Sequence, residues 1–218
     1  MSLTPLPPSP WEFEPAEWPD EDCVGGGADL EPATIVDAYR HGAFPMPHGR
    51  RLLWWSPVER GVLEPGDLRV SRSLRKSMRA FTITVDTDFE AVIDACADRR
   101  RPGHWITAPV REAYVRLHHL GWAHSVETRD EEGRLVGGLY GLGIGSLFAG
   151  ESMFHHRTDA SKAALVGLVD VMSTLPDWLV DTQWQTPHLA SLGVRVVGRA
   201  DYIERIKGLV DGPTPVWP

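Results

Sequence analysis

The stretch LFAGESMF at residues 147–154 places one acid, Glu151, among apolar and very small side chains. A second stretch, WLVDTQW at residues 178–184, does the same with Asp181 and Gln183. Both have the composition of buried strands, where an uncompensated polar group costs roughly 2–7 kcal/mol. A buried Asp can serve as a structural hydrogen-bond hub, and a Glu at a strand end can cap the following helix. Two such strands in one chain nevertheless favour a shared cleft that carries out chemistry.

The segments around these stretches predict a mixed sheet flanked by helices. Antiparallel hairpins come first and strand–helix–strand units follow, which is typical of the α+β class. The run TDFE at 87–90 fits a capping box, and Thr107 is placed to cap the next helix. We expect strands near 81–85, 123–128, 135–142, 146–151, 178–184 and 194–197, and helices near 89–96, 107–120, 160–173, 188–192 and from residue 201.

Composition sets the start of the chain apart. Residues 1–30 form an acidic leader rich in Pro and Gly, for which we expect partial disorder. The segment that follows is expected to contain a helix at 32–39 and an aromatic strand at 52–55.

The net charge of −8 comes mainly from the first part of the chain. Residues 1–37 hold nine acids and no Lys or Arg, which leaves 22 basic against 21 acidic residues in the remainder. Two basic islands occur there, at 69–79 and 99–101. Such islands suit a polyanion, although a solvated helix face has the same composition.

Several classes of protein are disfavoured. Two cysteines and scattered histidines predict neither a disulfide framework nor a metal site. The glycines at 141, 143 and 145 have the wrong spacing for a dinucleotide-binding loop, and no nucleophile elbow is present. Without a signal peptide or an apolar span, a cytoplasmic protein that does not enter a membrane is expected.

Nine tryptophans are many for 218 residues, and Trp55 and Trp105 stand at the ends of expected elements. Core packing is the usual role of Trp. Aromatic faces at element ends also stack on nucleobases or border an amino-acid pocket.

Several ordered runs make a family resemblance specific. The most typical are LFAGESMF at 147–154, DASK at 159–162, DTQ at 181–183 and HLASLG at 188–193. Through them the sequence resembles the bacterial leucyl/phenylalanyl-tRNA–protein transferases over roughly residues 34–206. Further matching runs are GAFP at 42–45, LWWSP at 53–57, SRS at 71–73, WIT at 105–107, EAY at 112–114, LH at 117–118, AHSVE at 123–127 and LVGGLYG at 135–141.

The resemblance implies a small N-terminal domain at residues 31–68 and a larger catalytic domain at residues 69–218, and it implies that the larger domain has an acetyltransferase-like (GNAT) fold. It places Asp181, Gln183 and Glu151 at the reaction centre. Thr182 stands where the family commonly has Cys, and its side chain is expected to face away from the cleft. The implied binding residues are Trp55 and Trp105 at the aminoacyl-adenosine end, Phe148, Ser152, Met153 and Leu139 around the incoming side chain, and Arg72, Arg75, Lys76 and Arg79 along the tRNA backbone.

The implied activity is transfer of Leu or Phe, and Met more slowly, from aminoacyl-tRNA to the α-amine of proteins beginning with Arg or Lys, which marks them for N-degron degradation. The ester is already activated, so the reaction is expected to need no ATP, metal or other cofactor. The protein is expected to be a monomer. An α-amine has a pKa of about 7.7–8.0, so a weak base is enough to remove the proton that blocks its lone pair. We hypothesise that Gln183, polarised by Asp181, accepts a hydrogen bond from this amine, and that Glu151 or Asp181 attracts the cationic N-terminus.

Two rival functions stay open at this point. An acyl-CoA-dependent N-acetyltransferase of the GNAT class would hold a pyrophosphate at a helix N-terminus, but Asp159 stands where that helix is expected to begin. A non-enzymatic RNA-binding module would explain the basic islands and the tryptophans. It would not explain the polar residues within the apolar strands.

Overall fold

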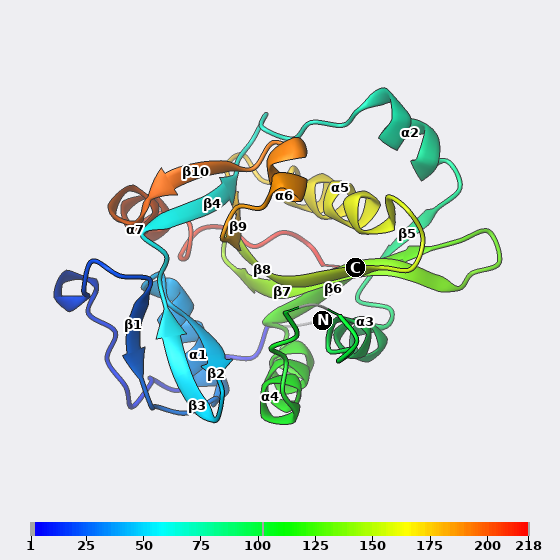
Figure 1. Cartoon of the computed structure of the whole chain (residues 1–218). Coiled ribbons are helices and arrows are strands. Elements are labelled where there is room, and N and C mark those ends of the chain that lie inside the picture. The colour runs from blue at the N-terminus through cyan, green and yellow to red at the C-terminus, as the bar shows by residue number, and fades with distance from the viewer. Residues whose placement is uncertain (1–2, 102, 218) are drawn as a thin grey trace.

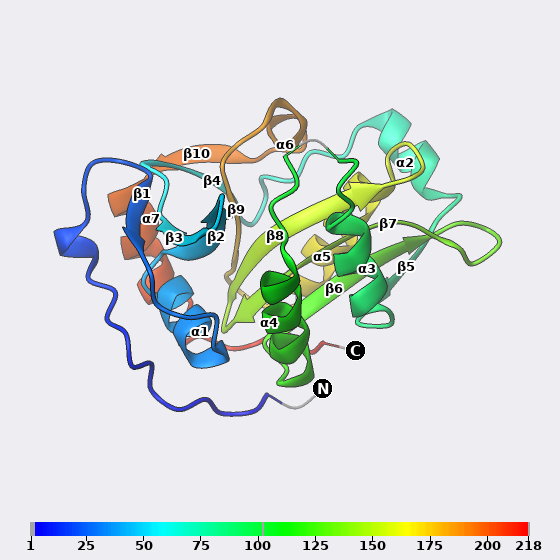
Figure 2. The same cartoon turned by 60° about the horizontal axis from the view of Figure 1, so that its bottom comes forward.

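The computed structural model describes residues 3–101 and 103–217, and its centre is a seven-stranded mixed sheet (Figure 1). The strand order is β10-β4-β9-β8-β7-β6-β5. Helices α3 and α4 cover one face of the sheet and α5 covers the other (Figure 2). The strands are β4 (Glu59–Leu63), β5 (Thr82–Val85), β6 (Ala123–Arg129), β7 (Leu135–Ile144), β8 (Leu147–His155), β9 (Leu179–Gln183) and β10 (Arg195–Gly198).

The helices of this larger unit lie close to their expected positions, except the first, which was not expected. They are α2 (Arg72–Met78), α3 (Phe89–Cys96), α4 (Ala108–His119), α5 (Ala160–Met172), α6 (Pro187–Ser191) and α7 (Arg199–Lys207). The expected capping bonds are not formed: the N-cap of α3 is Asp88 and not Thr87, and neither Asp88 nor Thr107 caps its helix with a side-chain bond. The Thr87 hydroxyl bonds instead to buried Glu127, at 2.8 Å.

Strands β8 and β9 are parallel neighbours for only a short distance. Their pairs are Leu147 with Leu179, Phe148 with Val180 and Ala149 with Asp181. Parallel strands require a long crossover, which α5 supplies here. Beyond the third pair β8 continues along β7 while β9 continues along β4. The two strands therefore separate at Gly150 and Thr182.

A three-stranded antiparallel sheet of order β1-β3-β2 packs with α1 beside the larger sheet (Figure 1). Its elements are β1 (Cys23–Gly26), α1 (Pro32–Arg40), β2 (Phe44–His48) and β3 (Arg51–Trp55). The next strand, β4, already belongs to the larger sheet. Residues 59–63, which we had grouped with the small N-terminal domain, therefore pair within the larger sheet. Strand β2 was not expected, and it forms although two of its five residues are prolines.

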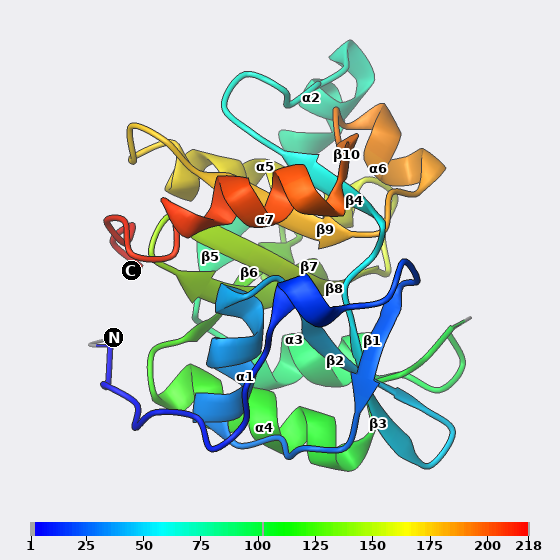
Figure 3. The ribbon, with the colours of Figure 1, turned by 90° about the vertical axis from the view of Figure 1, so that its left-hand side faces the viewer.

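The leader, for which we expected partial disorder, follows a defined path from residue 3 onward. It runs along α1 to a short 3-10 helix (Pro15–Glu17) and then adds β1 to the small sheet (Figure 3). The Thr4 carbonyl accepts a bond from the Trp122 indole at 2.9 Å. Phe13 is buried with its ring centroid 4.9 Å from that of Trp54. Aromatic anchoring offsets the polar composition on which the expectation rested.

Across the described parts of the chain, no helix combines the length and the apolarity that crossing a bilayer requires.

Replacing Phe13 by Ala tests whether the leader contributes to stability. The ring is 8% exposed, so its removal should lower the free energy of unfolding by about 3 kcal/mol. Trp11→Ala, at a side chain that is 46% exposed, is the control and should cost less than about 1 kcal/mol. Urea unfolding of both variants makes the comparison. Equal small losses would mean that the leader is only loosely attached.

Candidate active site

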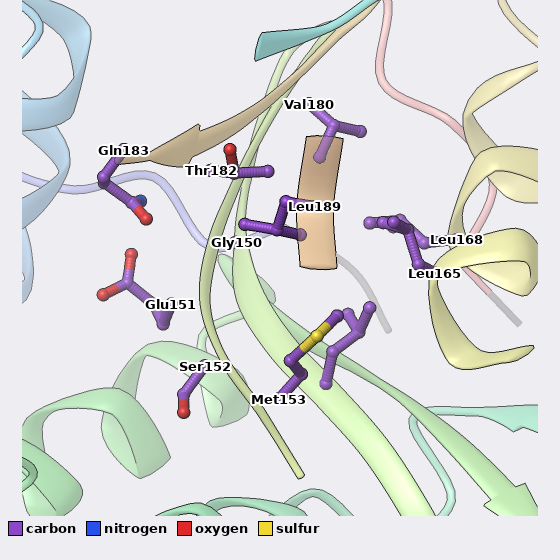
Figure 4. Close-up of a pocket in the computed structure, with 11 residues that line it drawn as sticks. Gly150, Glu151, Ser152, Met153, Leu165, Leu168, Val180, Thr182, Gln183 and Leu189 are labelled. Atoms are coloured by element: carbon purple, nitrogen blue, oxygen red, sulfur yellow. The ribbon is translucent and has the colours of Figure 1, made fainter. Parts of the chain in front are cut away.

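A pocket opens where β8 and β9 separate (Figure 4). Its cavity volume is about 120 Å³. One side is apolar and the other carries Glu151 and Gln183, whose side chains point toward each other (Figure 4). The lining residues are Leu139, Gly150, Glu151, Ser152, Met153, Leu165, Leu168, Val180, Thr182, Gln183 and Leu189.

Glu151 is held by two tyrosine hydroxyls. Tyr39 donates to Oε1, and Tyr114 donates to Oε2 at 3.0 Å. The two hydroxyls also lie 2.9 Å from each other. Burial raises the pKa of Glu151 to about 8, with a smaller contribution from Asp181, although both tyrosine bonds act in the opposite direction. The carboxyl group can therefore take up or release a proton close to neutral pH.

The two tyrosines come from different parts of the fold. Tyr39 lies on α1 of the small sheet unit and Tyr114 lies on α4 against the large sheet. Both side chains are fully buried, and burial beside Glu151 raises the pKa of each phenol well above its usual value. They therefore act as hydrogen-bond donors at neutral pH.

Asp181 is fully buried and paired with Arg60, a residue that we did not predict at the site. Arg60 Nε donates to Oδ1 at 2.8 Å, and a terminal nitrogen donates to Oδ2 at 2.5 Å. Tyr202 donates to Oδ2 at 2.9 Å, and the backbone N–H of Gln183 donates to Oδ1 at 2.9 Å. Both oxygens of this carboxylate are thus occupied by protein donors.

Gln183 is oriented by an unusual backbone. Its φ is +56°, in the left-handed region that is uncommon for residues other than Gly. The pairing of β4 with β9 also shifts register between Gly61 and Val62, opposite Gln183 and Asp181. The side chain consequently reaches the pocket, while Asp181 two residues earlier points to Arg60. Within the described residues, the buried Nε2 of Gln183 has no hydrogen-bond partner.

Thr182 corrects one expectation. Its side chain was expected to face away from the cleft, but it lines the pocket next to Val180 and Gln183 (Figure 4). Its hydroxyl bonds to the Gly61 carbonyl at 3.1 Å. Strand alternation places Val180 and Thr182 on the pocket side and Asp181 on the opposite side, so the expectation had assigned the cleft to the wrong face of β9.

The other predicted binding residues are placed as follows. Leu139, Ser152 and Met153 line the pocket. Phe148 is fully buried in the core, with its ring centroid 5.7 Å from that of Trp217. Trp55 and Trp105 are half-buried outside the pocket lining, and Trp55 donates to the Met46 carbonyl.

The predicted tRNA-contacting residues lie together on or next to α2. All four are exposed, and among the residues that the structure describes none of them forms an ion pair. They are Arg72, Arg75, Lys76 and the C-capping Arg79. Free cations on one short helix leave room for a polyanion.

Sequence reasoning missed Arg60, Tyr39 and Tyr202. Arg60 had a usable signal, because it is a charge within a short strand that otherwise continues with Gly61, Val62 and Leu63. The tyrosines had none, since a buried Tyr on an amphipathic helix looks like any other core residue.

The arrangement combines an apolar cavity with an acid that titrates near neutral pH and an amide without a partner. In the described part of the chain no three His, Cys, Asp or Glu side chains are grouped so as to hold a metal ion. The donors present suit binding of an amine or an amide beside an apolar group.

Comparisons with known proteins identify relatives across nearly the whole chain. The family model of leucyl/phenylalanyl-tRNA protein transferase matches residues 62–207, and its N-terminal domain model matches residues 28–58. The leucyl/phenylalanyl-tRNA–protein transferase of Dechloromonas aromatica is 47% identical over 217 residues, covering 94% of this chain and 92% of the relative. That of Stutzerimonas stutzeri is 49% identical, covering 88% and 86%.

One solved structure, L-PGS from Bacillus licheniformis, aligns with a TM-score of 0.40 and 15% identity, covering 83% of this chain and 61% of that one.

The raised pKa of Glu151 predicts a pH-dependent stability. The folded chain binds this proton more tightly than the unfolded chain, whose Glu has its ordinary pKa of 4.5. The stabilising contribution is therefore complete below pH 4.5 and is lost as the pH rises to about 8. Glu151→Gln does not titrate, so its unfolding free energy relative to wild type should increase by about 2–4 kcal/mol between pH 5 and pH 9.

Urea unfolding at several pH values measures this difference. Exposed Glu112→Gln is the matched control and should show no such trend. A pH-independent difference for Glu151→Gln would contradict the assignment.

Proposed function

The chain belongs to the leucyl/phenylalanyl-tRNA protein transferase family, and we propose that it transfers Leu or Phe, and Met more slowly, from aminoacyl-tRNA to the α-amine of proteins that begin with Arg or Lys. It is accordingly an aminoacyltransferase. The observation that carries the detailed proposal is the pocket in which an apolar wall faces Glu151 and Gln183. Such a site can hold an aminoacyl side chain and place the ester carbonyl next to polar groups.

The reaction needs positioning and proton transfer more than activation. The amine nitrogen attacks the ester carbonyl carbon, an amide bond forms, and the ester bond to the terminal ribose breaks, with the ribose oxygen leaving. Holding amine and ester together can contribute several kcal/mol, up to roughly 7–11 in the best cases. The amine must also lose two protons overall, one to a base and one to the leaving oxygen.

Glu151 suits the role of the base. Its pKa of about 8 is close to the value of about 7.7–8.0 for an α-ammonium group. Proton transfer between groups of matched pKa is nearly balanced in free energy, which favours catalysis near the operating pH. Gln183 would accept a second hydrogen bond from the amine through its carbonyl oxygen, and its Nε2 would face the ester.

The apolar wall would select the transferred residue. Leu139, Met153, Leu165, Leu168 and Leu189 bring flexible or branched aliphatic side chains to it. One methylene changes binding in such a pocket by only about 1–3 kcal/mol. Leu, Phe and Met should therefore be accepted at graded rates, whereas charged side chains are rejected. Phe148 is left out of the proposed contact set because it is fully buried.

The tRNA would be held outside the pocket. The exposed cations of α2 offer contacts to backbone phosphates, and Trp55 and Trp105 offer aromatic faces to the terminal adenosine. A pyrophosphate of an acyl-CoA at the start of α5 is disfavoured. The Asp159 carboxylate lies there, bonded to Ser77 and Lys162.

The divergence of two parallel strands around the pocket supports a GNAT-like classification of the larger unit. We place the protein in the cytoplasm as a monomer, where aminoacyl-tRNA is available, with N-degron marking as the outcome of transfer.

A direct assay tests the activity and the acceptor class. Labelled Leu-tRNA is incubated with the protein and peptides that differ only in an N-terminal Arg, Lys, Asp or Ala. We expect extension of the Arg and Lys peptides alone. An Nα-acetylated Arg peptide is the control and should stay unmodified. Equal extension of all four free peptides would refute the proposed acceptor class.

The basic helix generates a separate prediction. Replacing Arg75 and Lys76 by Ala should weaken tRNA binding and reduce the slope of log Kd against log salt by roughly one per lost phosphate contact. Lys207→Ala on α7, at the opposite end of the sheet (Figure 1), is the matched control. Unchanged affinity and slope in the double variant would leave α2 as an ordinary solvated helix.

A further inference from the structure

We propose that Arg60 is a positioning residue of the transfer reaction, which holds Asp181 and, through it, the backbone turn that presents the Gln183 amide to the pocket. The inference rests on the proposed function and extends it to a residue outside the pocket lining. Asp181 acts in this scheme through the backbone of Gln183 and does not contact the substrate amine.

The first step of the argument is the environment of Arg60. Its side chain is fully buried on β4, with the guanidinium 4.3 Å from the Tyr202 ring centroid and 5.1 Å from that of Phe44. Besides its two bonds to Asp181, it donates to the Gly42 carbonyl at 3.1 Å. Burial alone would lower the pKa of Arg60, but the Asp181 carboxylate raises it above its usual value. A charged group this deep in the fold requires a charged partner.

The second step concerns Asp181. Its Oδ1 accepts from Arg60 and from the Gln183 N–H, and its Oδ2 accepts from Arg60 and Tyr202. The residue is 0% exposed and does not belong to the pocket lining. With both oxygens committed, the carboxylate has no direction left for a substrate.

The third step connects the pair to the pocket. A non-Gly residue in the left-handed region is strained, and it persists where surrounding contacts impose it. Gln183 has such a backbone, and the bond from its N–H to Asp181 Oδ1 is the side-chain contact that the structure provides for that backbone. If the carboxylate moves, the Gln183 side chain loses its direction toward Glu151.

The planar fork of arginine explains why this residue occupies the position. It makes two parallel bonds to one carboxylate and a third to Gly42, which lies between α1 and β2 of the small unit. Lysine keeps the charge but lacks this geometry. Arg60→Lys therefore perturbs direction while leaving the charge balance intact.

Steady-state kinetics of Arg60→Lys form the first arm of the test. A small misplacement of a reacting group can cost about a hundredfold in rate, so we expect kcat to fall 10- to 100-fold. The Kd for aminoacyl-tRNA should stay within about threefold. Arg205→Lys is the matched control, because Arg205 forms ion pairs with Glu64 and Asp177 away from the pocket. Tyr202→Phe removes a single donor to Asp181 and offers a milder variant if Arg60→Lys does not fold.

A double-mutant cycle with Gln183→Ala distinguishes positioning from general stability. If Arg60 acts through the Gln183 side chain, Arg60→Lys should lower kcat less than about twofold in the Gln183→Ala background. Tyr202→Phe should show the same non-additivity. Additive losses in kcat would overturn the proposal.

Hydrogen exchange provides a readout independent of activity. The Gln183 amide should exchange at least tenfold faster in Arg60→Lys than in wild type, while the Leu142 amide in the centre of β7 should be unchanged. A uniform increase at both amides, or no increase at Gln183, would refute the positioning role. Wild type that transfers no amino acid would refute the proposed function, and the exchange result would still decide the role of Arg60 in holding the turn.

Discussion

Strands β8 and β9 share backbone bonds over three residue pairs and then part, and the pocket exists because of that separation. Leaving a central pair of strands unpaired exposes backbone groups, which is costly unless other partners are available. Here β7 continues along β8 and β4 continues along β9, so each strand keeps one neighbour. Side chains from Gly150 onward and from Thr182 onward are thereby directed into open space between layers that are otherwise closely packed.

Two carboxyl groups at this point, fully buried Asp181 and half-buried Glu151, have opposite environments. Asp181 accepts four hydrogen bonds, two of them from the Arg60 guanidinium, so its carboxylate is held in one position. Glu151 faces two phenols and a low-polarity pocket, so its charge is poorly compensated and its pKa rises to about 8. Because the groups lie near each other, a negative Asp181 adds to that rise. One carboxylate is a fixed acceptor within the fold, and the other can exchange a proton near neutral pH.

Much of the larger unit could be predicted from sequence, because long apolar patterns with clear breaks define β6 to β8 and α5. The short strands β2 and β4 were not predicted, because β2 contains two prolines and β4 combines a glycine with buried Arg60. The apposition of Glu151 and Gln183 followed from two polar residues in buried strands. The opposite directions of Asp181 and Gln183 did not, because the left-handed backbone at Gln183 turns its side chain away from the face of Asp181, which residue alternation does not encode. Long-range partners such as Tyr39 and Tyr202 depend on packing alone.

Tyr39 belongs to α1, yet its hydroxyl bonds to a carboxyl group on β8, 112 positions away in the chain. The small three-stranded unit therefore lowers the pKa of Glu151 through this hydrogen bond. Withdrawing that phenol would strip one donor from the carboxylate and make its proton harder to release. The pKa of Glu151 therefore depends on how the small three-stranded unit packs against the larger sheet. A movement of α1 relative to β8 would change that pKa without changing any residue that lines the pocket.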